Sequence, residues 1–339
     1  MTAAACILGC SGPSLTKAEI AFFRDARPWG FILFARNVED PDQVRALTAS
    51  LRETVGRADA PVLVDQEGGR VQRLGPPHWR RYPPARAYDG LPDPLLRRTM
   101  ARLGARLMAH DLAAVGINAN CAPVLDVPDP RSHAVIGDRA YAETADEAAV
   151  LGRATAEGLI AGGVLPVIKH IPGHGRARSD SHETLPVVDA PPEALDVRDF
   201  APFRALSDMP AAMTAHVVYA AFDRRRPATT SPAVLRGVVR GRIGFHGLLV
   251  SDDLSMHALS GDFVGRARAA RRAGCDVVLH CNGDMAEMRA VVEGAGRLAG
   301  PSARRAQAAL ARLPAEVEPF DASAGRARFD AAFDGRLAA

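Results

Sequence analysis

The chain has 339 residues, of which 47% are hydrophobic and 24% are charged. This length and composition are those of a globular protein with a large buried core. The net charge of +3 comes from 42 basic and 39 acidic residues, and no long basic run is interleaved with aromatic residues, so we expect no nucleic-acid partner. We also expect no membrane span, because no stretch of 18 or more apolar residues occurs.

The five cysteines give an odd number and show no CxxC spacing. This pattern indicates neither a disulfide framework nor a zinc site, and it favours a reducing compartment. The run Ile7-Leu8-Gly9-Cys10 faintly resembles a lipoprotein cleavage site, but no basic segment precedes it and its apolar stretch is short. We interpret it as part of a first strand and expect a cytoplasmic protein.

Apolar, β-branched runs alternate with helical patterns along most of the chain, which indicates repeated βα units and a parallel sheet. Helix starts are predicted at Thr16 and Thr144, each of which opens a capping box, and at Asp40, which precedes a proline. Another helix is expected after Asp93. The predicted strands are residues 3–8, 30–34, 61–64, 117–124, 165–168, 211–215, 248–250 and 277–279.

This succession of strands and helices approaches the eight βα units that close a barrel. No linker rich in Pro, Ser and Gly divides the chain, so we predict an α/β fold with one (β/α)8 barrel domain over residues 1–339. From about residue 301, a helix and a polar tail are expected outside the barrel.

Five of the predicted strands end in ionisable residues. In a parallel barrel these ends converge on one rim, where active sites lie. A polar residue that leaves a strand into a turn would explain any one of them, whereas five together favour a functional site. The residues are Asp65, Lys169 with His170, His216, Asp252 with Asp253, and His280.

The segment from Lys169 to His182 is the strongest local signal. Its two glycines and one proline within seven residues exclude a helix interior, so it is a structured loop with several histidines. A metal site is one interpretation, but no HExxH helix or acidic cluster accompanies it. We favour a pair in which Asp180 orients the imidazole of His182 and stabilises its charged form.

The run K-H-I-P-G-H-G-x4-D-S-H resembles the signature of glycoside hydrolase family 3, in particular its single-domain bacterial β-N-acetylglucosaminidases of peptidoglycan recycling. The resemblance extends in consistent order from about residue 5 to residue 300. Ile171 stands where many relatives have Phe, and the Pro- and Arg-rich connection from Arg73 to Asp93 has no match. Further matching blocks are residues 30–37, 64–73, 136–139 and 251–256.

The resemblance implies a retaining exo-β-N-acetylglucosaminidase that releases terminal β-linked GlcNAc from muropeptides such as GlcNAc-anhydroMurNAc. It implies that Asp252 is the nucleophile, which forms a covalent glycosyl-aspartate, and that His182 with Asp180 is the acid/base dyad. No metal or other cofactor is implied, and we expect a monomer. The substrate-binding positions would be Asp65, Arg73, Arg139, Lys169 and His170.

An imidazole, with an ordinary pKa of about 6.5, can donate a proton and later accept one near neutral pH. Asp252 has to stay ionised in order to attack, which Lys169 and Arg139 would favour. Asp252 could instead be a helix N-cap, although Asp253 is the better candidate for that role.

Three other functions stay open at this point. A β-glucosidase of the same family would resemble longer chains with a carboxylate acid/base from a second domain. A glycosyl phosphorylase would benefit from the lower negative charge of a histidine acid/base. An inactive sugar-binding barrel would be expected to lack Asp252 or the pair Asp180 and His182, and all three are present.

Overall fold

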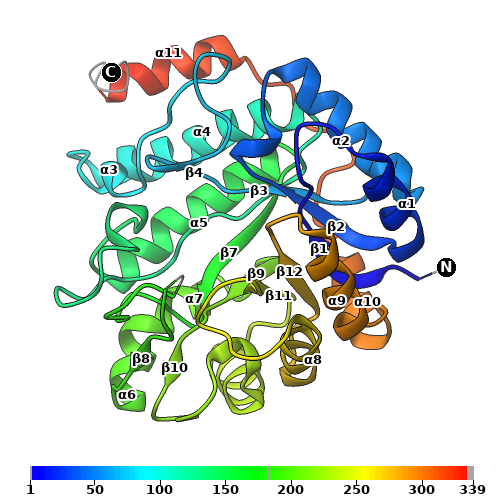
Figure 1. The fold of residues 1–339 in the computed structure, drawn as a ribbon. Coiled ribbons are helices and arrows are strands. Elements are labelled where there is room, and N and C mark those ends of the chain that lie inside the picture. The colour runs from blue at the N-terminus through cyan, green and yellow to red at the C-terminus, as the bar shows by residue number, and fades with distance from the viewer. Residues whose placement is uncertain (1, 182, 334–339) are drawn as a thin grey trace.

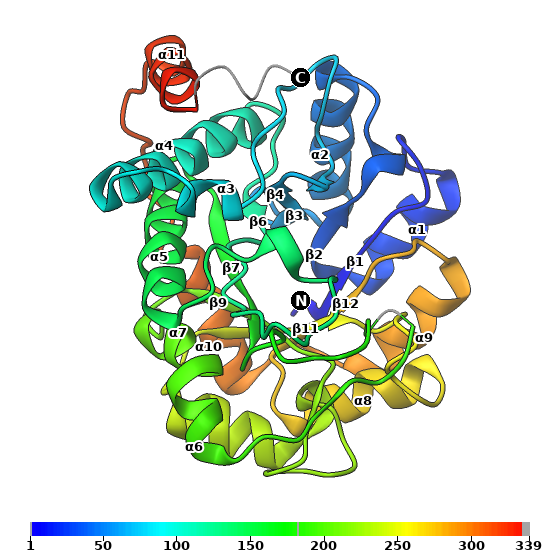
Figure 2. The ribbon, with the colours of Figure 1, turned by 90° about the vertical axis from the view of Figure 1, so that its left-hand side faces the viewer.

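The computed structural model describes residues 2–181 and 183–333. Parallel strands close into a barrel with helices around it, and the last strand pairs with the first (Figures 1 and 2). The predicted (β/α)8 fold is thereby confirmed. In barrel order the strands are β1 (Ala4–Leu8), β2 (Pro28–Leu33), β3 (Val62–Val64), β6 (Ala119–Asn120), β7 (Leu165–Ile171), β9 (Ala211–Thr214), β11 (Leu248–Asp253) and β12 (Val277–His280).

Two of these strands differ from the prediction in a way that matters for the site. The predicted strand 117–124 shortens to β6, because Pro123 has no N–H for a continuous ladder, and Val124 pairs with Lys169 only as an isolated bridge. Strand β7 extends three residues beyond the predicted end. Lys169 and His170 therefore lie within a strand and are fixed by its neighbours.

The helices form the outer layer around the barrel, and their caps largely follow the sequence signals (Figure 2). The Thr16 hydroxyl accepts the N–H of Glu19 at 3.2 Å, and the Glu19 carboxylate accepts the N–H of Thr16 at 2.8 Å, so this capping box is complete. The capping box predicted at Thr144 is only half formed. The Thr144 side chain caps its helix, but the Glu147 carboxylate lies 3.7 Å from Arg97 in an ion pair. The α-helices packed around the barrel are α1 (Lys17–Ala26), α2 (Pro41–Val55), α4 (Pro94–Ala113), α5 (Ala145–Ala161), α7 (Ala201–Ala205), α8 (Phe263–Ala273) and α9 (Met285–Ala295).

Shorter elements occupy the connections between the strands and helices. A hairpin of β4 (Gln66–Gly68) and β5 (Val71–Gln72) directly follows β3. The sequence did not predict it. The remaining elements are α3 (Arg86–Asp89), α6 (Pro192–Ala194), β8 (Val187–Val188) paired with β10 (Val218–Tyr219), the 3-10 turns η1 (Ala35–Asn37), η2 (Gly137–Arg139) and η4 (Ala228–Thr230), and the π-helical segments η3 (Leu195–Asp199) and η5 (Ala233–Arg242).

The chain after residue 299 holds two helices, α10 (Gly300–Leu310) and α11 (Ala322–Ala332), where one helix and a polar tail were expected. Ala306 and Ala309 of α10 join the apolar cluster inside the barrel. Helix α11 lies beside α4 (Figure 1), and its Phe329 is fully buried against aromatic side chains. Phe333 belongs to the same apolar cluster, and Arg326 of α11 lies 2.7 Å from Asp111 of α4, so packing and an ion pair together fix this segment. In the described part of the chain, no helix has the length and apolar character to cross a membrane.

Candidate active site

A cavity of about 240 Å³ opens at the carboxyl ends of the barrel strands. Asp65 follows β3, Lys169 and His170 end β7, and Asp252 lies at the end of β11. The predicted residue His182 lies outside the described residues. All other predicted site residues line this cavity, namely Asp65, Arg73, Arg139, Lys169, His170, Asp180 and Asp252.

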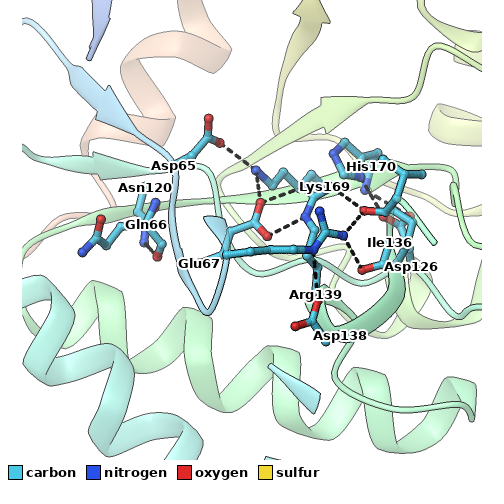
Figure 3. Close-up of polar contacts among 12 residues, drawn as sticks. Asp65, Gln66, Glu67, Asn120, Asp126, Ile136, Asp138, Arg139, Lys169 and His170 are labelled. Atoms are coloured by element: carbon cyan, nitrogen blue, oxygen red, sulfur yellow. Dashed lines mark hydrogen bonds and ion pairs between the residues drawn. The ribbon is translucent and has the colours of Figure 1, made fainter. Parts of the chain in front are cut away.

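A chain of alternating charges forms one wall of the cavity (Figure 3). Lys169 Nζ lies 2.8 Å from Asp65 Oδ1 and 2.7 Å from Glu67 Oε1. Arg139 binds both carboxylate oxygens of Glu67 at 2.8 Å, and Arg73 Nη2 lies 3.3 Å from Asp65 Oδ2. The Lys169 and Glu67 side chains are 3% and 5% exposed, so these groups hold one another in place away from bulk water.

The mutual contacts keep every member of this chain charged. Burial by itself would raise the pKa of Asp65, but Lys169 and then Arg73 outweigh it and hold that pKa well below its ordinary value. The pKa of Glu67 is lowered in the same way by Lys169 and Arg139, against its burial. Burial opposes the charge of Lys169, yet Asp65 and Glu67 raise its pKa. The wall therefore presents fixed cations and anions to a polar ligand at neutral pH.

Glu67 is the member of this wall that the sequence prediction missed. It belongs to the same matching block as Asp65 and Arg73, which were assigned roles, whereas Glu67 was not. Residues two apart in an extended chain point to the same side, so the spacing of Asp65 and Glu67 was a usable signal. Glu67 lies on β4 of the unpredicted hairpin, which turns its carboxylate back toward Lys169.

Asp126 is a second residue that the prediction missed. Its Oδ2 lies 2.6 Å from His170 Nδ1 (Figure 3). Its Oδ1 accepts the backbone N–H of His174 at 2.6 Å. Burial alone would raise the pKa of this fully buried carboxyl group, but His170 reverses the effect and lowers it. A carboxylate on Nδ1 fixes the orientation of the His170 ring. The signal in the sequence was an aspartate just beyond the predicted strand 117–124.

Asp252 is held ionised, and Lys169 is one of the expected groups that contribute to this. Burial would raise its pKa, but His216, then His170, the N–H of Asp253 and finally Lys169 lower it below the ordinary value. Arg139, the other residue expected to do this, forms an ion pair with Glu67 and is not among the main groups that lower this pKa. An ionised carboxylate beside a cavity of this size can act as a nucleophile.

Asp253 was the better candidate for a helix N-cap, but it caps a turn instead. Its Oδ1 accepts the N–H of Ser255 at 3.0 Å and that of Cys281 at 3.2 Å, while helix α8 is capped by Asp262. Asp253 thereby fixes the backbone next to Asp252.

The histidines at the ends of β9 and β12 do not line the cavity in the described part of the chain. His216 is buried, with Nε2 2.9 Å from the carbonyl oxygen of Asp253 and Nδ1 2.7 Å from the Thr229 hydroxyl. It therefore supports the loop that carries Asp252. His280 packs edge-on against Phe263, with its ring centroid 5.1 Å away.

No cluster of three or more His, Cys, Asp or Glu side chains suited to a metal ion occurs among residues 2–181 and 183–333. The absence of a cofactor stays a prediction. What the described geometry provides is a polar cavity that is lined by the charged wall, by Asp180 and by the ionised carboxylate of Asp252.

Comparison with known proteins identifies the family. The model of the glycosyl hydrolase family 3 N terminal domain matches residues 19–313. The chain belongs to glycosyl hydrolase family 3. This glycoside hydrolase is 41% identical to a β-hexosaminidase of Methylococcus capsulatus over 303 residues, which cover 88% of this chain and 89% of the relative. It is also 41% identical to a β-hexosaminidase of Alkalilimnicola ehrlichii over 283 residues, which cover 81% of this chain and 80% of the relative.

Solved structures of the family have the same barrel. NagZ from Neisseria gonorrhoeae in complex with N-trifluoroacetyl-D-glucosamine superposes with a TM-score of 0.85 at 32% identity, covering 98% of both chains. A family 3 β-N-acetylglucosaminidase from Paenibacillus superposes with a TM-score of 0.86 at 30% identity, covering 97% of this chain and 67% of that one. The resemblance that the sequence motifs indicated is confirmed.

Proposed function

We propose that this glycoside hydrolase is a retaining exo-β-N-acetylhexosaminidase that releases terminal β-linked N-acetylglucosamine. The observation that carries the proposal is that Asp252, held ionised, lines the same cavity as the charge chain from Arg73 to Arg139. Relatives that match most of the chain are named β-hexosaminidase, and a structural relative holds an N-acylated glucosamine.

Sugar binding is assigned to the predicted residues of the charged wall together with His170. Carboxylates accept hydrogen bonds from sugar hydroxyls, and Lys and Arg donate to hydroxyl and acetamide oxygens. Because these side chains are already fixed by one another, binding requires little rearrangement. The assigned residues are Asp65, Arg73, Arg139, Lys169 and His170.

In the first step of the proposed reaction, Asp252 attacks the anomeric carbon and the bond to the aglycone oxygen breaks. His182, oriented by Asp180, gives its proton to that oxygen. In the second step, water attacks the glycosyl-aspartate, His182 accepts a proton from the water, and Asp252 is released. The configuration is retained because two displacements occur at the same carbon.

We further infer that residues 1–339 act as one catalytic domain, as a cytoplasmic monomer without a metal or other cofactor. The inferred substrate is a muropeptide that carries terminal GlcNAc on anhydro-N-acetylmuramic acid. Activity that survives EDTA is expected, since every required group is a side chain. Activity that EDTA abolishes and zinc restores would contradict the inference.

Substrate choice tests the proposed function. Hydrolysis of nitrophenyl β-N-acetylglucosaminide should be much faster than hydrolysis of the matching β-glucoside, because only the former carries the acetamide group. Initial rates on both substrates, measured side by side with the purified protein, distinguish the two activities. Equal or faster turnover of the glucoside would make a β-glucosidase the better assignment.

The nucleophile has its own test. Asp252→Ala should lower kcat/KM by about 10⁴-fold or more on every substrate, because no other group is placed to attack the anomeric carbon. A fluorinated sugar with a good leaving group should trap the intermediate, and peptide mapping by mass spectrometry should locate it on Asp252. An adduct on the neighbouring Asp253 would overturn the assignment.

The acid/base role is tested by leaving-group dependence. His182→Ala should be slowed far less on a dinitrophenyl glycoside than on a glycoside with a poor leaving group, because dinitrophenolate departs without a proton. General acid catalysis contributes about 100- to 10,000-fold, and the gap between the substrates should approach this range. Equal impairment on both substrates would show that His182 has another role.

A further inference from the structure

Ser181 is a buried residue in a largely exposed loop. It is 3% exposed, whereas Arg178 and Glu183 on either side are exposed. Its Oγ lies 3.2 Å from Nε2 of His174, and its carbonyl oxygen accepts the N–H of Ala258 at 3.3 Å. Two separate segments, one after β7 and one after β11, thus fix the position of Ser181.

The burial of the His174 side chain is energetically unfavourable. Its side chain is buried, and within the described chain Nδ1 has no hydrogen-bond partner. Burial, followed by the proximity of His170, lowers the pKa of His174 to about 4, so the ring is neutral at neutral pH. A buried imidazole with one unsatisfied nitrogen is less favourable than an apolar side chain of similar size. Packing alone therefore does not account for a histidine here.

The backbone of His174 is held as firmly as its side chain. The N–H of His174 donates to Asp126, the same carboxylate that contacts His170. A Cβ on the next residue, Gly175, would lie 2.0 Å from the carbonyl oxygen of Val127, so the chain passes that backbone without room for a side chain. His174 is thus a rigid point on the barrel from which the more exposed loop can be held.

We propose that His174 and Ser181 form a latch that positions Asp180 at the rim of the cavity. Asp180 lines the cavity and precedes Ser181 directly, and its carbonyl oxygen accepts the N–H groups of Glu183 and Thr184 at 3.1 and 3.0 Å in a tight turn. A displacement of Ser181 therefore displaces Asp180. The proposal rests on the proposed function, in which Asp180 orients the general acid. His174 and Ser181 are positioning residues in it.

The test uses full-length variants and two aryl N-acetyl-β-glucosaminides, one with a dinitrophenyl and one with a poor leaving group. Ser181→Ala should lower kcat/KM on the poor leaving group by about 10- to 100-fold, a part of the range for complete loss of general acid catalysis. On the dinitrophenyl substrate the change should stay within about 3-fold. His182→Ala serves as the reference for the full loss, and Asp180→Ala for the weaker loss that follows when the imidazole is present but poorly oriented.

Matched variants separate the latch from a general effect of the loop. Ser179→Ala, two residues away at a position with no hydrogen bond to another described residue, should behave as the unmodified protein. His174→Phe should resemble Ser181→Ala, and His174→Gln should restore most activity, because its amide can reach the Ser181 hydroxyl. Ser181→Ala added to Asp180→Ala should cause little further loss, since both act through one group. Thermal unfolding checks that each variant is folded.

The possible outcomes distinguish a failure of the latch from a failure of the proposed function. If Asp180→Ala discriminates between the leaving groups and folded Ser181→Ala does not, the latch is wrong and the proposed function stands. Equal losses on both substrates in Ser181→Ala would also overturn the latch, because they indicate a contact with the sugar. If Asp180→Ala shows no discrimination, the acid/base assignment itself fails and the latch fails with it.

Discussion

Glu67 links two cations, because its Oε1 lies 2.7 Å from Lys169 Nζ and 2.8 Å from Arg139 Nη2. Removal of one partner from a buried ion pair leaves an uncompensated charge, which typically costs about 3–5 kcal/mol. Glu67→Ala should therefore lower the free energy of unfolding by roughly this amount. Urea denaturation followed by circular dichroism measures it.

The control for Glu67→Ala is a substitution in a solvent-exposed ion pair. Arg70 and Asp138 lie 3.1 Å apart with both side chains about half exposed, and such pairs contribute less than about 1 kcal/mol. Asp138→Ala should thus change the free energy of unfolding little. If Glu67→Ala and Asp138→Ala lower the free energy of unfolding equally, the buried charge chain does not stabilise the protein more than an exposed ion pair does.

The β4–β5 hairpin is the element that brings Glu67 and Arg73 to the site. Gly68 and Gly69 turn it at φ values of 97° and 57°, and a Cβ on Gly68 would lie 2.3 Å from the carbonyl oxygen of Pro83. The side-chain amide of Gln66 then holds the segment that follows β5, because its Oε1 accepts the N–H groups of Arg73 and Leu74, both at 3.0 Å.

Gln66→Met keeps the length of the side chain but removes these hydrogen bonds. We expect a loss of at least about 2 kcal/mol in unfolding free energy, because each unsatisfied buried group costs about 1–3 kcal/mol. KM should rise more than kcat falls, since Arg73 is assigned to binding. Gln307→Met, at an exposed position of α10, is the control and should stay within about 0.5 kcal/mol. Equal effects would show that the hairpin is not held by Gln66.

The whole molecule should lose stability in acid in two stages. Burial lowers the pKa of His174 to about 4 from its ordinary 6.5, and it also lowers the pKa values of His216 and His280. Because the unfolded chain then binds more protons, this contribution is complete above about pH 6.5 and is lost as the pH falls toward 4. For His174 alone the loss is about 3 kcal/mol at 1.36 kcal/mol per pKa unit.

The second stage comes from carboxylates. The pKa values of Asp65, Glu67, Asp126 and Asp252 are lowered in the native state, so their contribution is present above about pH 4 and is lost below it. The urea midpoint should fall between pH 6.5 and 4 and again below pH 4. His174→Gln should flatten the first stage, whereas His246→Gln, at an exposed position, should not. An unchanged midpoint between pH 7 and pH 5 would contradict this reasoning.

Local chemistry and periodicity were enough to predict the barrel. Capping at Thr16 and Asp40 and the apolar strand runs are properties of neighbouring residues, so they could be read from the sequence and reappear in the structure. Convergence of strand ends then placed Asp65, Lys169 and Asp252 at one rim. The hairpin after β3 and the burial of α11 by Phe329 were not predicted, because they depend on contacts between distant segments.

Residue types and their order determined the family and the fold, because the motifs and the βα alternation are linear patterns. Only the tertiary structure decided which charges meet. Arg139 was expected to favour the ionised form of Asp252, and its ion-pair partner is Glu67; Asp126 joins His170 to His174 across 44 and 48 residues of chain. Such pairings depend on distances of a few ångströms between segments that the sequence leaves far apart. Their strength depends on burial, which arises only when the barrel closes.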